Sequence, residues 1–246
     1  MAAAGFMKML GYGAKELGIG LDAGAVDLFD RYYRELTKWN RRMNLTSIEG
    51  EEEVAIKHFL DSLTCLLAVD LPEGCNVVDV GSGAGFPGVA LKVARPGIKL
   101  TLVEASRKKA EFLRDIVEVL GLGDVEVLWD RAERVGRTAG HRESYDVATA
   151  RAVAEMAVLA ELCLPLVKVG GVLVAQKGPS ASEEVAGALA AVEAMGGRVE
   201  RLIPVSLPFG YGGRTLAVIR KESQTPEKYP RRPGIPDKRP IRGRVS

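Results

Sequence analysis

The sequence predicts an α/β fold in which a mostly parallel seven-stranded sheet carries helices on both faces. Strand-like and helical segments alternate from about residue 75 to 220, which is typical of such a sheet. A glycine-rich loop follows the first strand, as in many α/β proteins that bind a nucleotide. The last two strand-like segments follow one another without a helix, so one strand should run antiparallel to the others. We divide the chain into a helical extension (1–70), this core (71–220) and a basic tail (221–246).

The N-terminal extension contains one informative helix over about 25–43. Its apolar residues recur every three or four positions, which places them on one helical face: Leu28, Tyr32, Leu36, Trp39 and Met43. Basic residues recur on another face: Arg31, Arg34, Lys38, Arg41 and Arg42. This basic stripe fits either an ordinary solvated face or a surface laid along phosphates. Residues 1–24 carry no motif that we can interpret.

The core should contain five strands that alternate with helices, followed by two more strands. The first five strands are expected at Val77–Val80, Leu100–Glu104, Val125–Leu128, Asp146–Ala150 and Val172–Gln176. The helices between and after them are expected at about 87–95, 106–120, 153–168 and 181–195. The last two strands, Val199–Leu207 and Arg214–Arg220, are joined by the short glycine-rich link 208–213 and should pair antiparallel.

The tail is the most basic part of the chain. Residues 221–246 hold eight basic side chains, three acidic ones and five of the twelve prolines, a net charge of +5, whereas 1–220 carry −3. Such a basic, proline-rich and poorly foldable segment suggests contact with a polyanion, or else a solvated tail.

Composition excludes several classes of protein. The 246 residues, 47% hydrophobic and 27% charged, describe an ordinary globular chain with one large domain. No run approaches the roughly 20 apolar residues of a membrane span, and we see no signal peptide, so we expect a cytoplasmic protein with no membrane contact. The cysteines, which we expect to be reduced, and the two histidines are scattered, so we expect no metal site.

The glycine loop has three possible interpretations. A phosphate-binding P-loop needs Lys-Ser/Thr after its last glycine, but Val89 and Ala90 follow Gly88 here. A dinucleotide fingerprint matches Gly83, Gly85 and Gly88 but is weak alone. The pattern D-x-G-x-G-x-G, from Asp79 through glycines 81, 83 and 85, is similar to the S-adenosylmethionine loop of Rossmann-like methyltransferases. A carboxylate beside the loop favours a cationic ligand over a pyrophosphate.

Other strand ends supply further candidate residues. Glu104 ends the second strand, where a carboxylate can accept hydrogen bonds from ribose hydroxyls. Arg107, Lys108 and Lys109 fall in the first turn of the next helix, where cations oppose the helix dipole. Residues that oppose a local stability preference, as these cations oppose the helix dipole, are concentrated at functional sites. We therefore expect this cluster to face the same anion as the basic stripe.

Several segments together resemble the family of small-subunit (16S) ribosomal RNA methyltransferase G, also called glucose-inhibited division protein B. They are Trp39–Thr46, His58–Leu63, Asp79–Gly88, Arg131–Glu133, Arg151–Ala152, Lys177–Gly178 and Pro226–Arg231. The glycine loop alone is not specific to this family, but the set in this order is.

The resemblance implies a Rossmann-like class I S-adenosylmethionine-dependent fold of seven strands. It also implies methyl transfer to N7 of a guanine in 16S rRNA, position 527 in conventional rRNA numbering, with S-adenosylhomocysteine as product. The implied cofactor contacts are Gly81, Phe86, Glu104, Ala105, Ser106, Ala132, Glu133 and Arg151, to which the loop pattern adds Asp79, Gly83 and Gly85. With an rRNA substrate, the basic stripe, Arg107–Lys109, Lys177, Arg231 and Arg232 become candidate RNA contacts. The partner is then 16S rRNA or the small ribosomal subunit, and we expect a monomer.

Guanine N7 is a lone-pair nucleophile that loses no proton, so no general base is needed at this atom. Asp61 is a candidate for stabilising the positive charge that develops on the base, or is simply an acid on a helix surface. Arg151 is a better candidate for orienting the cofactor than for taking part in the chemistry. Asn40 and Asn44 either bond a guanine edge or cap the helix.

Other activities remain compatible with the motifs. A related methyltransferase could act on a small molecule or a protein, although the basic residues argue against this. A non-catalytic RNA-binding or assembly factor could retain the loop, and an NAD-linked oxidoreductase is the least favoured alternative.

Overall fold

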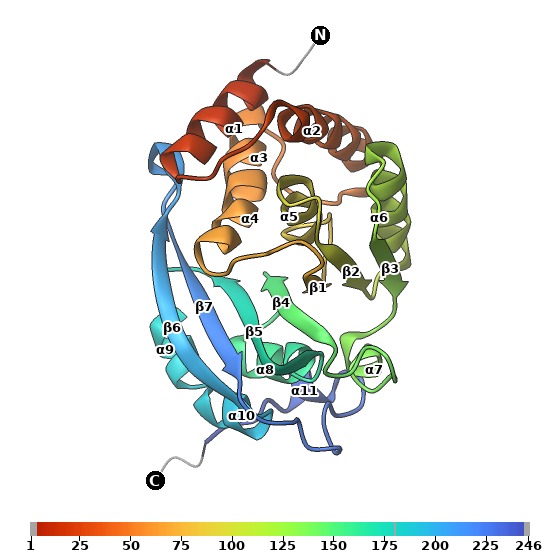
Figure 1. The fold of residues 1–246 in the computed structure, drawn as a ribbon, viewed down its shortest axis with the longest axis vertical. Coiled ribbons are helices and arrows are strands. Elements are labelled where there is room, and N and C mark those ends of the chain that lie inside the picture. Colours follow the sequence, from red (N-terminus) through yellow and green to blue (C-terminus); the bar gives the residue numbers. More distant parts are fainter. Residues whose placement is uncertain (1–3, 180, 244–246) are drawn as a thin grey trace.

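The computed structural model describes residues 4–179 and 181–243, and its core is a seven-stranded sheet in the order β3-β2-β1-β4-β5-β7-β6 (Figure 1). The strands are β1 (Asn76–Val80), β2 (Lys99–Glu104), β3 (Val125–Trp129), β4 (Tyr145–Arg151), β5 (Val167–Lys177), β6 (Gly197–Ser206) and β7 (Gly213–Lys221). Among the described strands only β7 is reversed, since it pairs antiparallel with both β5 and β6. The predicted mostly parallel sheet with one antiparallel strand is therefore confirmed. β5 begins earlier than predicted because Val167 pairs with Tyr145 before an irregularity at Gly170, whose φ is +88°.

Helices cover both faces of the sheet, as predicted, but two of them are shorter than expected. The core helices are α5 (Gly88–Ala94), α6 (Arg107–Leu120), α7 (Ala132–Val135), α8 (Met156–Cys163), α9 (Ala181–Ala186) and α10 (Leu189–Ala194). The helix predicted over 153–168 ends at Cys163, because Pro165 cannot continue a helix. The one predicted over 181–195 is broken at Gly187 and Ala188.

The N-terminal segment is helical, as predicted, and packs on the same face of the sheet as α5 and α6 (Figure 1). It comprises α1 (Ala4–Glu16), α2 (Ala23–Met43), α3 (Glu51–Val54), a π-helical stretch (Ala55–Leu60), α4 (Asp61–Leu63) and a 3₁₀ turn (Thr64–Leu67). Phe6 of α1 stacks on Tyr33 of α2 with ring centroids 4.5 Å apart and meets Phe59 edge-on. These rings belong to one hydrophobic cluster with β1, β2, α5 and α6. Within the described residues, no helix has the length and hydropathy to cross a membrane.

The expectation of a poorly foldable tail is wrong for residues 222–243. After β7 the chain packs along the molecule and forms α11 (Ile235–Lys238). Arg231 donates from its Nε and Nη2 to Glu161 of α8 at 2.9 and 2.6 Å, and its backbone N–H donates to the same carboxylate at 2.7 Å. Arg142 donates to the carbonyls of Thr225 and Tyr229 at 2.6 and 2.9 Å. The tail is held because core side chains satisfy its backbone, which its own composition does not reveal.

Candidate functional site

The loop after β1 adopts a backbone that only glycine tolerates well. Gly81, Gly83 and Gly85 have φ values of +71°, +58° and +89°. A Cβ on Gly81 would lie 2.6 Å from a Val153 methyl, and one on Gly85 would lie 2.3 Å from the Tyr32 hydroxyl oxygen. Gly81 and Gly85 therefore cannot carry a side chain for two reasons, the left-handed backbone and the lack of space for a Cβ atom.

Asp79 lies beneath this loop and does not line open space. Its side chain is completely buried and accepts hydrogen bonds from the Gly88 backbone N–H at 3.1 Å and the Thr149 hydroxyl at 3.0 Å. Burial raises the pKa of this carboxyl to about 6. The structure thus gives Asp79 a role in holding the loop to α5 and β4, and not the open contact with a cationic ligand that the loop pattern suggested.

Glu104 joins the first two strand ends. It is 8% exposed, and its carboxylate accepts from the backbone N–H of Gly83 at 2.9 Å and of Ser106 at 2.7 Å. The structure therefore brings Glu104, Ala105 and Ser106 to the glycine loop, as the sequence predicted. The carboxylate is fixed at the edge where ligands bind in open α/β sheets.

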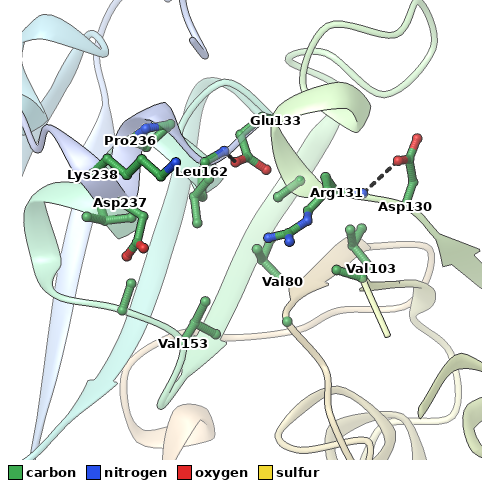
Figure 2. A pocket seen from close by; sticks show the side chains of 16 residues that line it. Val80, Val103, Asp130, Arg131, Glu133, Val153, Leu162, Pro236, Asp237 and Lys238 are labelled. Carbon is green, nitrogen blue, oxygen red and sulfur yellow. Dashed lines mark hydrogen bonds between the residues drawn. The ribbon is translucent and has the colours of Figure 1, made fainter. Parts of the chain in front are cut away.

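A cleft of about 530 Å³ opens at this edge, between the ends of β1, β2 and β3 and the C-terminal helix α11 (Figure 2). It includes the turn after β4, so it spans the point where the strand order reverses between β1 and β4. Its predicted lining residues are Gly81, Ala105, Ala132 and Glu133. Its other lining residues include Val80, Val103, Asp130, Arg131, Val153, Leu162, Gly234, Pro236, Asp237 and Lys238.

Reasoning from the sequence missed the wall of this cleft that the C-terminal tail forms, at Gly234 and residues 236–238. Glu133 is 5% exposed and accepts from the Gly234 backbone N–H at 2.8 Å, which fixes the turn into α11. Glu133 therefore holds in place the tail residues that form this wall. The only sequence signal for this wall was the tail motif Pro226–Arg231, just before it.

Three stacked rings connect the loop to the N-terminal helices. Phe86 lies between Tyr32 of α2 and His58 of the π-helical stretch, at centroid distances of 5.2 and 4.9 Å and interplanar angles of 12° and 8°. The Tyr32 hydroxyl also donates to the Ala84 carbonyl at 2.5 Å. Burial lowers the pKa of His58 to about 3, so this ring is neutral. Phe86 is 4% exposed and both faces of its ring are covered, so its cofactor contact, which the resemblance implied, stays a prediction.

Asp61 is neither an acid on a helix surface nor a free carboxylate. Its side chain is 4% exposed and pairs with Arg151 at 3.3 Å and Arg214 at 3.2 Å. Arg151 also donates to the Lys57 and His58 carbonyls at 3.1 and 3.3 Å. The burial contradicts the expectation of an acid on a helix surface, and two guanidinium groups neutralise the carboxylate. Arg151 lies at the predicted strand end, with its guanidinium 5.2 Å from the Phe86 ring centroid.

A family model described as "rRNA small subunit methyltransferase G" (GidB) matches residues 25–206, from α2 to the end of β6. The chain belongs to this family. Relatives named ribosomal RNA small subunit methyltransferase G are 54% identical in Pelotomaculum thermopropionicum, over 93% of this chain and 96% of the relative, and 48% identical in Alkaliphilus metalliredigens, over 94% and 96%. The Roseiflexus sp. relative is 51% identical over 96% of this chain and 100% of its own.

Solved structures bear out the fold. A "SAM dependent methyltransferase from Aquifex aeolicus" superposes with a TM-score of 0.50 at 21% identity, over 76% of this chain and 97% of that one. "MtNAS in complex with MTA and tNA" superposes with a TM-score of 0.53 at 15% identity, over 89% and 86%. These likenesses identify the Rossmann-like methyltransferase fold that the sequence predicted for this member of the methyltransferase G family.

Two basic residues of this family member that were predicted to contact RNA instead bind groups within the protein. Lys177 donates to the Ala154 carbonyl at 2.6 Å and pairs with Glu184 at 2.7 Å, with its side chain 10% exposed. Arg231 is bound to Glu161, as described above. A buried or half-buried carboxylate binds each of these cations, so neither is a free cation on the surface.

The basic stripe on α2 is exposed along its length. Arg31 donates to the Val119 carbonyl of α6, and Arg34 pairs with the buried carboxylate of Asp30. Lys38 forms a surface pair with Glu35. Arg41, Arg42, Arg107 and Lys108 are also exposed, as is Glu111, which pairs with Arg107 at 2.9 Å. Exposed pairs of this kind are weak and leave their cations available to phosphate.

The two asparagines serve the backbone. Asn40 accepts from the Thr46 N–H at 2.8 Å through its side-chain oxygen. Asn44 ends α2 in the left-handed conformation, with φ 48° and ψ 54°. The structure shows the capping alternative for Asn44, whereas Asn40 holds the loop that follows the helix.

Proposed function

We propose that this protein transfers a methyl group from S-adenosylmethionine to N7 of a guanine in 16S rRNA, position 527 in conventional numbering, and releases S-adenosylhomocysteine. The observation that carries the proposal is the cleft at the switch point of the sheet, with Glu104 fixed beside the glycine loop, in a chain of the methyltransferase G family. We expect it to act as a monomer in the cytoplasm and without a metal.

The residues of the cleft and of the adjoining glycine loop fit this cofactor. The Glu104 carboxylate is held by two backbone donors and is placed to accept from the ribose hydroxyls. The apolar side chains Val80, Val103 and Leu162 give the cleft a surface for the flat adenine ring. The loop presents backbone without side chains, which supports a close approach at Gly81, Gly83 and Gly85. When bound, S-adenosylmethionine supplies an electrophilic methyl group on a sulfonium.

The residues of this chain then contribute to catalysis by positioning the guanine and the cofactor. His58 is neutral and stacked, and Asp61 is bound by two arginines, so neither group is offered as a free base. This agrees with N7 of guanine, which gives up a lone pair and no proton. Holding such a nucleophile in line with an electrophile accounts for several kcal/mol, about 7–11 in favourable cases.

The direct test is transfer to unmethylated small subunits and to naked 16S rRNA, each incubated with labelled S-adenosylmethionine and the protein. Product 7-methylguanosine is mapped by borohydride and aniline cleavage. We expect one cleavage, at the predicted guanine, and none with Glu104→Gln, which should weaken cofactor binding. Cleavage at another nucleotide, or no transfer to either substrate, would contradict the proposal.

The RNA contacts are tested by salt dependence. Each lost phosphate contact should reduce the slope of log affinity against log salt by about 0.7–0.9. We expect this for Arg41→Gln and Arg42→Gln in a filter-binding titration with 16S rRNA. Lys177→Gln is the matched control, because its ammonium is already bound to Glu184 and its loss should leave the slope unchanged. Equal slopes in all three variants would refute the basic stripe as an RNA surface.

A further inference from the structure

We propose that Trp129, with the cations around it, is a stacking site for an unpaired RNA base beside the cofactor cleft. The inference rests on the proposed function, since it assumes an RNA substrate, and it adds a residue that neither the motifs nor the basic stripe includes. The site lies at the carboxyl end of β3, next to Asp130 and Arg131 of the cleft.

Trp129 is a large aromatic side chain that the fold leaves open. It is 52% exposed at the end of β3, which is an edge strand of the sheet that the described residues form (Figure 1). Isolated exposed hydrophobic residues are normal and need no explanation by themselves. Trp129 differs because two contacts fix the plane of its ring.

The first contact is the indole N–H, which donates to the Ala105 carbonyl at 3.2 Å. The second is the Arg107 guanidinium, which lies 5.7 Å from the ring centroid, within the range of a cation–π interaction. An indole held in this way loses little further rotamer freedom when a base stacks on it. Ala105 also lines the cleft, so the ring is attached to the wall of the cofactor site.

The surroundings carry the charge that RNA requires. Segments 107–111 and 130–134 flank the ring and contain five cations and three carboxylates. Glu133 is buried against the tail, whereas Arg107 is 71% exposed and Arg134 is 64% exposed along their side chains. Exposed aromatics within basic surfaces bind single-stranded nucleic acid, because each base stacks while its phosphate meets a cation.

The partner is therefore an unpaired nucleotide near the target guanine. A base inside a duplex is already stacked and cannot cover the ring. The adenine of the cofactor is the competing occupant of this region, because Trp129 bonds to Ala105 and Ala105 lines the cleft. The experiment separates these two ligands.

The first measurement is tryptophan fluorescence in the Trp39→Phe background, where Trp129 is the only tryptophan left. The probe is a single-stranded oligoribonucleotide with the sequence around the target guanine, its duplex form, or small subunits. We expect quenching by the single strand and by subunits, little by the duplex, and none by S-adenosylmethionine alone. Quenching by the cofactor alone, or by neither RNA form, would overturn the proposal.

The second measurement compares Trp129→Ala and Trp129→Phe with Leu189→Ala, which removes another exposed side chain on α10 at the opposite end of the sheet. Stacking on an aromatic side chain is worth about 1–3 kcal/mol per base, so Trp129→Ala should weaken RNA binding by about 5- to 150-fold. We expect Trp129→Phe to recover part of this, the KM for RNA to rise with little change in kcat, and the Kd for S-adenosylmethionine to stay unchanged.

The outcomes distinguish this site from the proposed function. If Trp129→Ala binds RNA as the parent does while the parent still methylates the guanine, the stacking site is refuted and the function stands. An effect on whole subunits but not on naked rRNA would assign Trp129 to a ribosomal protein and overturn the proposal. Absence of transfer by the parent refutes the function itself.

Discussion

Arg231→Met tests whether the ion pair between tail and core holds the cofactor cleft together. Glu161 is 1% exposed along its side chain and receives the Arg231 backbone N–H as well as its guanidinium. Removing one partner of a buried pair costs about 3–5 kcal/mol, because it leaves an uncompensated charge. Arg231 is itself 26% exposed, so we expect the lower end, about 3 kcal/mol.

Urea unfolding followed by circular dichroism measures this effect. With a slope of about 3 kcal/mol/M for a chain of this size, the midpoint should fall by about 1 M. The control is the double variant with Glu161→Met, which replaces both charges by apolar groups of similar volume and should recover part of the loss. Recovery is partial because Glu161 also accepts from the Arg231 backbone N–H, which methionine leaves without a partner. A single variant within about 0.5 kcal/mol of the parent, or a double variant no better than the single one, would refute the reasoning.

The same variant has a functional consequence. Arg231 lies three residues before Gly234, which contributes to the cleft wall together with Pro236 and Lys238. We therefore expect calorimetry to show weaker S-adenosylmethionine binding for Arg231→Met, in step with the lost stability. Unchanged affinity would show that this wall does not contact the cofactor.

Three further predictions follow from the loop and its surroundings. Gly85→Ala should abolish cofactor binding in calorimetry, because its Cβ would lie 2.3 Å from the Tyr32 hydroxyl oxygen at a φ of +89°; binding as tight as the parent's would contradict this. Burial raises the pKa of Asp79 to about 6. The protonated form of this group therefore stabilises the folded state by about 3 kcal/mol below about pH 4, and this stabilisation is lost as the pH rises to 6. Asp79→Asn should remove that slope in urea titrations from pH 4 to 7, and parallel curves would refute it. His58 has its pKa lowered to about 3, so it costs stability as the pH falls below about 6.5, and His58→Gln should lessen the acid loss in the same titration.

Most of the sheet could be predicted because its signals are local. Short apolar runs ending at Asp79 and Glu104, and the glycine-rich link before Arg214, determine strands and a reversal without reference to distant residues. The glycine loop was recognisable for the same reason, since its conformation depends on its own residues. Helix ends were less predictable, as at Pro165 and Gly187, where a single residue stops a pattern that otherwise continues.

The site was predicted less completely because charge in a sequence does not reveal its partner. Lys177, Arg231 and Asp61 look like free functional groups, yet each is bound by a side chain at least seven positions away. The partner of Arg231 is in a helix that reads as almost wholly apolar. Long-range pairs of this kind also order the tail, which composition alone predicts to be unfolded.

The stack of Tyr32, Phe86 and His58 has a consequence for how two ligands sense one another. The outer rings belong to the N-terminal helices and the middle ring to the glycine loop. Any ligand that binds one arrangement of α2 more tightly than another therefore also selects among arrangements of the loop. Such linkage is reciprocal, so the factor by which RNA changes cofactor affinity equals the factor by which the cofactor changes RNA affinity.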